Sequence, residues 1–218
     1  MNECEASRCD SVALVRGIFI VLLAMAAPAF ADDTEPPVTF HKGQVGFSAR
    51  FGLGERAIAT YDSKYYCGTL DSTAKYGYAP VCTGRTPFAL GLEASYGVSP
   101  SIELLVELRL GLERDFGGKP GDEGPRPLFV APGARFFFSE AKRAKLFVQP
   151  EAVFDFSGYK DAAGMDRGND FGVRGLEGLW VDLHRTYGMY LYVGETLEMA
   201  RWVEASFEVG VGFQGRYP

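Results

Sequence analysis

Apolar and polar residues alternate along most of the chain after residue 42. The clearest run covers 102–113, in which one set of alternate positions is apolar: Ile102, Leu104, Val106, Leu108, Leu110 and Leu112. The positions between them are mostly charged: Glu103, Glu107, Arg109, Gly111 and Glu113. Because successive side chains of a β-strand point to opposite sides, this run predicts a strand with one apolar wall and one charged wall.

The same alternation predicts seven further strands. They are expected at 43–54, 86–98, 127–138, 145–157, 170–183, 187–198 and 202–214. Two of them are less regular. Glu177 and Trp180 interrupt the pattern of 170–183, which predicts a β-bulge or a change of register there. In 187–198, Tyr190 and Tyr192 share the polar face with glycines.

The connections between these strands alternate in length. Short ones are expected at 99–101, 139–144 and 184–186, and the longer ones at 55–85, 115–126 and 158–169, with a tight one near Met199-Ala200. Short periplasmic turns and long external loops are typical of outer-membrane barrels. The chain is therefore predicted to be all-β, an antiparallel up-and-down transmembrane β-barrel of about eight strands. The barrel should cover 43–218, with both termini in the periplasm.

A soluble periplasmic ligand-binding β-barrel is the alternative fold, and the apolar face argues against it. Eight strands with five or six large apolar residues each exceed what a small barrel can enclose. The polar face is rich in glycine, alanine and serine, as a cramped interior requires. A lysine facing lipid costs about 2–4 kcal/mol at mid-membrane, and every lysine falls in a loop, in a turn or at the start of a strand: Lys42, Lys64, Lys75, Lys119, Lys142, Lys145 and Lys160.

The N-terminal residues indicate export. An apolar run begins at Val12 and ends in Ala29-Phe30-Ala31, the small-x-small pattern that signal peptidase cleaves. The run is shorter than the roughly 20 apolar residues of a membrane-spanning helix. Residues 1–31 are therefore predicted to be a cleaved signal peptide, and 32–42 a periplasmic segment.

Cleavage would leave two cysteines, Cys67 and Cys82, in one long connection. Two cysteines in an exported protein predict a disulfide, although two free thiols remain the alternative. The same connection carries several tyrosines, an amphipathic side chain common in binding surfaces. These tyrosines are the candidates for contact with an extracellular ligand: Tyr61, Tyr65, Tyr66, Tyr76 and Tyr78.

On this architecture, rather than on a diagnostic motif, residues 40–218 resemble the small eight-stranded outer-membrane proteins of the OmpA-transmembrane-domain, OmpX and OmpW-like class. The resemblance implies an integral outer-membrane protein in contact with lipid. One departure is the C-terminus, because the family usually ends in an aromatic residue, whereas this chain has Phe213 and Tyr217 but ends in Pro218.

The charged faces of the strands predict an ionic network inside the barrel. Its expected members are Arg50, Glu93, Glu103, Glu107, Arg109, Arg135, Glu151, Asp155, Arg174, Glu204 and Glu208. Arginine pairs well with buried carboxylates because its planar fork forms two hydrogen bonds. Such a network predicts a plugged interior and a structural or surface-recognition role. The excess of acids over arginines leaves open a narrow, cation-preferring channel for small solutes.

Other classes of function are disfavoured. The net charge of −6 and pI near 5.1 argue against a nucleic-acid partner. The two histidines, His41 and His184, provide no histidine-built metal site and lack the His-x-Ser pair of lipid-A deacylases. Asp161, Asp166, Asn169 and Asp170 lack the spacing of a calcium-binding EF-hand loop. The sequence thus predicts no enzyme, cofactor or metal, and a monomer.

Overall fold

The computed structural model describes residues 41–59, 81–115, 124–138, 142–160 and 166–217. All the described residues belong to one compact unit of the chain, Val38–Pro218. The segment before it, and with it the predicted signal peptide, lies outside the described residues. Among the described residues, no helix is long and apolar enough to cross a membrane.

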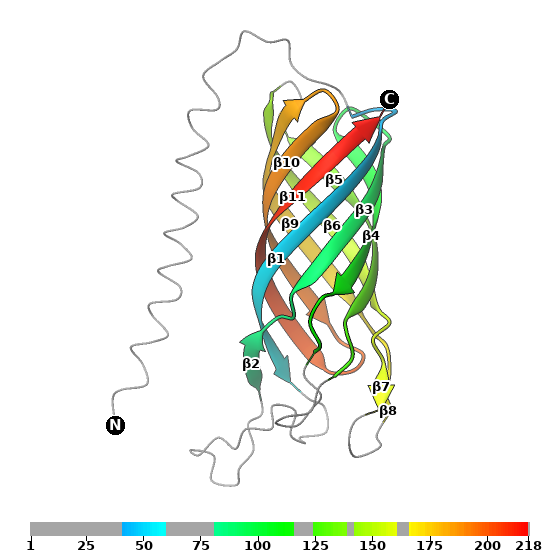
Figure 1. Ribbon diagram of the computed structural model, residues 1–218, viewed down its shortest axis with the longest axis vertical. Helices are drawn as coiled ribbons and strands as arrows, with labels where there is room; N and C mark the ends of the chain where they lie inside the picture. The colour runs from blue at the N-terminus through cyan, green and yellow to red at the C-terminus, as the bar shows by residue number, and fades with distance from the viewer. Residues whose placement is uncertain (1–40, 60–80, 116–123, 139–141, 161–165, 218) are drawn as a thin grey trace, which may run out of the picture. The chain divides into compact units, whose positions relative to one another are not determined.

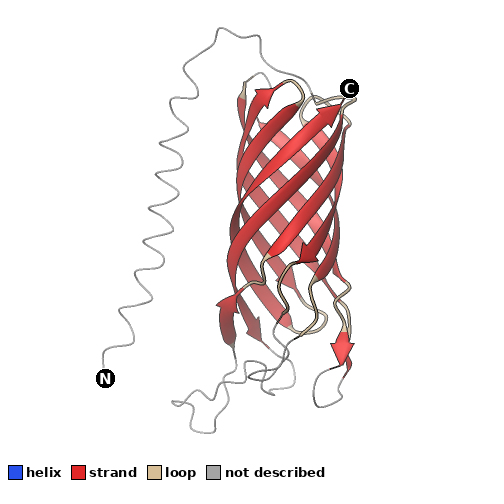
Figure 2. Cartoon of the chain, in the orientation of Figure 1, coloured by secondary structure: helices blue, strands red, loops and turns tan. Residues whose placement is uncertain are grey.

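This unit is built of β-strands (Figure 2). Eight long strands make up the wall of the barrel: β1 (Val45–Ala59), β3 (Ala89–Gly97), β4 (Ile102–Gly111), β5 (Leu128–Phe138), β6 (Ala144–Asp155), β9 (Asp170–His184), β10 (Tyr187–Glu198) and β11 (Val203–Tyr217). Three short ones extend it: β2 (Cys82–Arg85), β7 (Tyr159–Lys160) and β8 (Asp166–Arg167).

Each long strand pairs antiparallel with its neighbours along the chain, and the sheet closes on itself. The last strand, β11, pairs with the first, β1, from Val45↔Tyr217 to Ala59↔Val203. Figure 1 shows the two strands side by side and tilted across the front of the barrel. The prediction of a closed, antiparallel up-and-down barrel of about eight strands is confirmed.

The alternation of the sequence separates the outside of the barrel from its inside. In β6, for example, Leu146 and Phe154 are exposed, whereas Phe147, Gln149 and Val153 are buried. Most large outward side chains are apolar and exposed, such as Phe47, Leu53, Leu104 and Phe213. A surface of this kind is stable against hydrocarbon and unfavourable against water.

The predicted irregularity at Glu177 and Trp180 is wrong. Strand β9 keeps its register with β10 through both residues, and the shift lies at the end of that pairing, between Tyr187 and Gly188. Trp180 is buried inside the barrel, and Glu177 is exposed outside it. The error arose because a charged residue was assumed not to face outward, although here it does.

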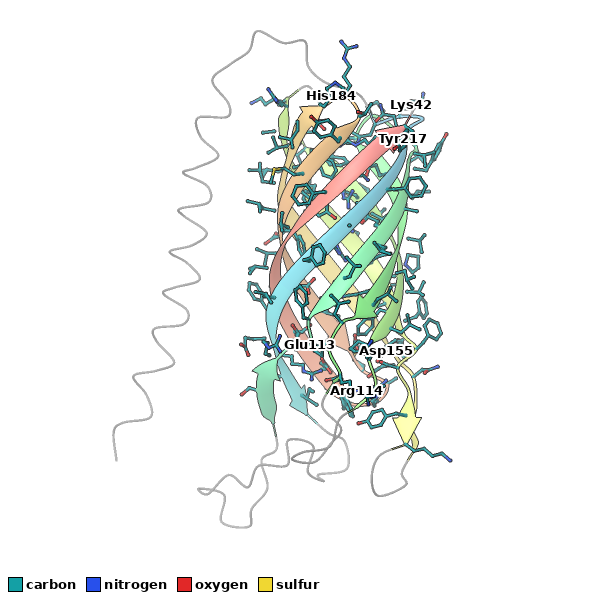
Figure 3. The ribbon with its side chains drawn as sticks, in the orientation of Figure 1. Lys42, Glu113, Arg114, Asp155, His184 and Tyr217 are labelled. Atoms are coloured by element: carbon teal, nitrogen blue, oxygen red, sulfur yellow. The ribbon has the colours of Figure 1, made fainter. Side chains whose placement is uncertain are left out.

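The two ends of the barrel differ. Lys42, His184 and Tyr217 lie at one end, together with the short connections after β3, β5 and β9; we call it the short-turn end (Figure 3). Glu113, Arg114 and Asp155 lie at the other, the long-loop end. Strand β1 was predicted to stop at residue 54, but it continues to Ala59 because β11 and β2 pair with this extension.

Candidate functional site

Charged side chains fill the centre of the barrel. Arg50 from β1 and Arg174 from β9 meet Glu107 from β4 and Glu151 from β6, and we name these four the central cluster. The Nε atom of Arg50 donates to Glu107 over 2.8 Å, and its Nη2 lies 3.5 Å from Glu151. Arg174 is ion-paired with both glutamates. Each carboxylate thus lies between two guanidinium groups.

A second cluster lies beside the first, around Arg135 of β5. Its Nη2 donates to both oxygens of Glu93 over 2.8 Å, and its Nη1 to Glu103 over 3.1 Å. Its Nε donates to Gln149 over 2.6 Å. The amide of Gln149 in turn donates to Glu93 and, over 2.7 Å, to Glu151. We name Arg135, Glu93, Glu103 and Gln149 the Arg135 cluster, and Gln149 joins it to the central cluster.

Aromatic rings surround the Arg135 guanidinium. Its central carbon lies 5.5 Å from the ring centre of Phe147, 5.4 Å from that of Trp180 and 5.2 Å from that of Tyr190. Trp180 and Tyr190 stack on each other. Arg135, Glu107 and Gln149 are each 0 % exposed. The ion pairs, the Gln149 amide and the aromatic rings therefore fill this level of the barrel, and none of these three residues is in contact with solvent.

Glycines make room for the inward aromatic rings. A Cβ atom on Gly212 would overlap the ring of Tyr190, and one on Gly210 would crowd the ring of Tyr192. The same holds for Gly91, where a Cβ would overlap the carboxylate of Glu107. Strand positions next to large inward side chains are thus occupied by glycine because any other residue would collide.

The short-turn end is closed by a third group, the end cluster of Lys145, Asp182, Arg216 and Trp180. The ammonium of Lys145 lies 2.8 Å from one Asp182 oxygen, and the guanidinium of Arg216 lies 3.1 Å from the other. The indole of Trp180 also donates to Asp182, over 2.8 Å. Arg216 lies over the Trp180 ring, 4.5 Å from its centre. All four side chains are buried.

His41 joins the end cluster to the Arg135 cluster. Its Nδ1 contacts Glu103, its Nε2 lies 3.1 Å from the Lys145 ammonium, and its ring stacks on Phe137. A lysine ammonium can only donate, so Nε2 must accept, and the ring is then a neutral imidazole with its proton on Nδ1. Burial lowers the pKa of His41, against the opposing effect of Glu103. Geometry and burial agree on the neutral form.

A glycine turn places His41 inside the barrel. Gly43 has a φ of 79°, a conformation that favours glycine, and the amide of Gln44 donates to the carbonyl of His41. Gly97 lies so close to the His41 carbonyl that a Cβ atom there would overlap it. The segment before β1 is therefore fixed against β3, with the imidazole pointing inward.

Toward the long-loop end the interior is more acidic. The guanidinium of Arg109 donates two hydrogen bonds to the carboxylate of Glu208, and Arg56 forms ion pairs with Asp115 and Glu204. Arg201 lies 2.8 Å from Asp155. Two further acids face inward on neighbouring strands, Glu198 of β10 and Asp170 of β9, and one Asp170 oxygen is buried without a hydrogen-bond partner.

The structure places all eleven residues of the expected network on the inner side of the barrel. Arg109 and Glu204 are half-buried and the other nine are buried. Glu113 instead lies exposed, where its carboxylate accepts from the Phe88 amide and pairs with Arg85. The hydrogen bond from the Phe88 amide is the main reason why the pKa of the Glu113 carboxyl is lowered, and the hydrogen bond from Arg85 is the next.

The residues that close the short-turn end were not predicted from the sequence: His41, Lys145, Asp182 and Arg216. Lys145 was placed at the start of a strand, but it precedes outward-facing Leu146 and so shares the inner face with Phe147. Arg216 shares its face with Glu208 by the same count. Applying the alternation to the first and last residues of each strand would have found these two.

The predicted loop features lie outside the described part of the chain. Tyr61, Tyr65, Tyr66, Tyr76, Tyr78 and Cys67 lie outside the described residues, as does the side chain of Cys82, although Cys82 begins β2. Within the described residues, no three His, Cys, Asp or Glu side chains are placed to hold a metal ion.

Comparisons with known proteins agree with the fold. No family model matches the sequence, and no curated protein matches it. Among solved structures, the chain is similar to the N-terminal β-barrel domain of Pseudomonas aeruginosa OprF, with a TM-score of 0.51 and 9 % identity over 81 % of this chain and 98 % of that one. Neisserial surface protein A is also similar, with a TM-score of 0.50 and 10 % identity over 81 % and 100 %. These likenesses show the eight-stranded outer-membrane barrel fold.

Proposed function

We propose that this outer-membrane barrel has a closed interior and serves a structural or surface-recognition role rather than that of a pore. The short-turn end faces the periplasm, as is usual for such barrels, and the long loops face outward. Recognition then falls to the long loops, including the tyrosine-rich connection between β1 and β3. A disulfide between Cys67 and Cys82 would restrict that connection.

The solvent-inaccessible ion network carries the proposal of a closed interior. A permeating ion needs a continuous path, but Arg135, Glu107 and Gln149 are 0 % exposed and bonded to partners on several strands. Opening a path would leave buried charges without partners, at a cost of about 3–5 kcal/mol for each broken pair. Rigid charge pairing thus favours a static core.

Recording from the purified barrel in planar bilayers tests the closed interior. We expect no conductance steps from the natural protein. Replacing the central cluster by small residues (Arg50→Ser, Glu107→Ser, Glu151→Ser and Arg174→Ser together) should create conductance if the variant folds, which its shifted migration on an unboiled gel would show. Steady conductance from the natural protein would overturn the proposal.

Loop recognition needs a separate test. Cells that express the barrel with Tyr65, Tyr66, Tyr76 and Tyr78 changed to Ser should lose adhesion to host-cell or abiotic surfaces, while the amount of folded barrel stays unchanged. Adhesion equal to that of the natural protein would remove the surface-recognition role and leave the structural one.

A narrow cation-preferring channel remains the second candidate, and one observation favours it. Glu198 and Asp170 face the interior near the long-loop end, beside Asp155 and Glu204, and the acids there outnumber the two arginines, Arg56 and Arg201. Such a mouth would concentrate cations. The same bilayer recordings, made across a salt gradient, would show a cation-selective reversal potential if this candidate holds.

A further inference from the structure

Two pairs of acids face each other inside the long-loop end of the barrel, where Figure 3 labels Asp155. Asp155 of β6 lies directly opposite Asp170 of β9, and Glu198 of β10 lies directly opposite Glu204 of β11. These strands are consecutive in the sheet. We name the four residues the mouth acids. Because like charges directly opposite each other destabilise a sheet, the mouth acids require cations beside them.

Within the described residues, cations reach only two of the mouth acids. Arg201 lies 2.8 Å from an oxygen of Asp155, and Arg56 lies 3.3 Å from an oxygen of Glu204. Arg56 is shared, because it also pairs with Asp115. The further basic side chains that the structure describes near this end are exposed: Arg85, Arg114, Arg126 and Lys160.

Glu198 is a mouth acid without a partner. It is only 8 % exposed, yet its carboxylate forms neither an ion pair nor a hydrogen bond with the described residues. The other three mouth acids act on it electrostatically, and Arg201 opposes them. Its side chain lies on the inner face over Gly172 of β9, where a Cβ atom would be 2.9 Å from the Glu198 Cγ. A buried carboxylate in this position favours a cation from outside the chain.

Asp170 provides a second free acceptor beside Glu198. Its Oδ1 accepts from the amides of Phe171 and Ala200, over 2.8 and 2.6 Å, whereas its Oδ2 is buried without a hydrogen-bond partner. Glu198 pairs with Gly172, two residues after Asp170, so the two acids are diagonal neighbours about 7–8 Å apart. One cationic group between them would therefore contact both carboxylates.

An organic ammonium group suits these acceptors better than a metal ion does. In the part of the chain that the structure describes, no three ligating side chains are placed to hold a metal. A primary ammonium has several N–H donors and no fixed coordination geometry, so two carboxylate oxygens suffice to bind it. The four mouth acids exceed the two inward arginines by two charges, which an occupant with two ammonium groups would balance.

From this arrangement we propose that the long-loop end of the barrel binds a linear polyamine, an alkyl chain that carries two or more protonated amines. One ammonium group donates to Glu198 and to the free oxygen of Asp170, and the alkyl chain extends toward the opening of the barrel. The binding needs no conducting path, so bilayer recordings test the closed interior separately from this proposal.

Isothermal titration calorimetry of the folded, full-length barrel in a neutral detergent tests the proposal. The probes are hexamethylenediamine and hexamethonium, which have the same alkyl chain and the same charge, but hexamethonium has no N–H donors. We expect saturable binding of the diamine, at least about tenfold tighter than that of hexamethonium, the effect of charge-assisted hydrogen bonds. Equal affinity for the two probes, or no saturable binding, would overturn the proposal.

Three variants locate the site. Glu198→Gln should weaken binding of the diamine by about tenfold or more. Glu195→Gln makes the same change on the exposed side of the same strand and should leave the affinity within about twofold. Asp170→Asn keeps one oxygen for the two backbone amides and should also weaken binding. Unboiled gel migration shows whether each variant folds, and natural affinity in a folded Glu198→Gln or Asp170→Asn would contradict the proposal.

A competition experiment distinguishes the polyamine from a metal ion. Mg²⁺ and Ca²⁺, added at the concentration of the diamine, should displace little of it, because the mouth acids provide no complete shell of oxygen ligands. If either metal ion binds more tightly than the diamine and Glu198→Gln abolishes that binding, the site belongs to a divalent cation and the proposal is overturned.

Discussion

Arg135 and Glu93 meet inside the barrel, with one guanidinium nitrogen 2.8 Å from both carboxylate oxygens and neither side chain exposed. The two residues come from β5 and β3, which are separated in the wall by β4. Their contact therefore crosses the interior instead of following the wall. It links strands that share no backbone hydrogen bonds.

Removing the guanidinium should destabilise the barrel strongly. In Arg135→Met, Glu93 and Glu103 lose a buried partner, and we expect the free energy of unfolding to fall by about 3–5 kcal/mol. Urea-induced unfolding in lipid vesicles, followed by tryptophan fluorescence, measures this loss. Arg85→Met is the matched control, because Arg85 pairs with Glu113 on the exposed surface. Equal losses in the two variants would contradict the structural role of the Arg135 cluster.

His41 should make stability depend on pH. Its ordinary pKa is 6.5, and burial lowers it in the folded barrel, where Glu103, Lys145 and Arg216 are the charged neighbours. The unfolded chain then binds the proton more tightly, so the stability present above pH 6.5 is lost as the pH falls toward the folded pKa, with a slope of up to about 1.4 kcal/mol per pH unit.

The variant His41→Gln isolates this effect. Glutamine keeps a donor and an acceptor but does not titrate, so the slope between pH 7.5 and 5.5 should be shallower than in the natural protein. Unfolding free energies measured at several pH values provide the comparison. If both proteins show the same slope, His41 is not the titrating group.

Gly212 should tolerate no side chain. A Cβ atom there overlaps the Tyr190 ring, which is itself stacked on Trp180 and so has little room to move. We expect Gly212→Ala to lower the unfolding free energy by about 1–3 kcal/mol. Gly84→Ala is the control, because no atom lies within 4 Å of a Cβ at Gly84. A neutral Gly212→Ala would mean that the ring packing is loose.

The outward carboxylate of Glu177 is expected to lower the free energy of unfolding of the barrel. It pairs with Val193 and Val148 on the outer wall, in the middle of β9, where a carboxylate is unfavourable against hydrocarbon. Glu177→Leu is expected to raise the unfolding free energy by about 1–2 kcal/mol, less than the cost of a lysine at mid-membrane. Val193→Leu exchanges one apolar side chain for another and should change little. A destabilised Glu177→Leu would show that the carboxylate has a stabilising partner.

The strands could be predicted from the sequence because alternation of period two directly reports which side of a strand each residue occupies. Arg50, Glu107 and Arg174 were assigned to the inner face on this ground alone, and the structure places them there. Alternation says nothing about which inward residues meet. That depends on the tilt and closure of the sheet, so the contact between Arg174 of β9 and Glu107 of β4 could not be foreseen.

Two errors had physical causes. Glu177 was read as an irregularity because the outer face was assumed to be uniformly apolar, whereas the strand tolerates one outward carboxylate without changing register. The end cluster was missed because strand ends are the least certain part of a pattern. His41 lies before β1 altogether, and only the turn at Gly43 brings its ring inside.

The pairing of the first strand with the last has a consequence for assembly. Arg216 and Glu208 both belong to β11, the last strand of the barrel in chain order. Until β11 joins β1, Asp182 lacks its partner Arg216 and Arg109 lacks its partner Glu208, and both edges of the sheet remain unpaired. The pairing of these interior charges and the closure of the β-sheet therefore occur together, as one cooperative event. A chain truncated before β11 would lack both.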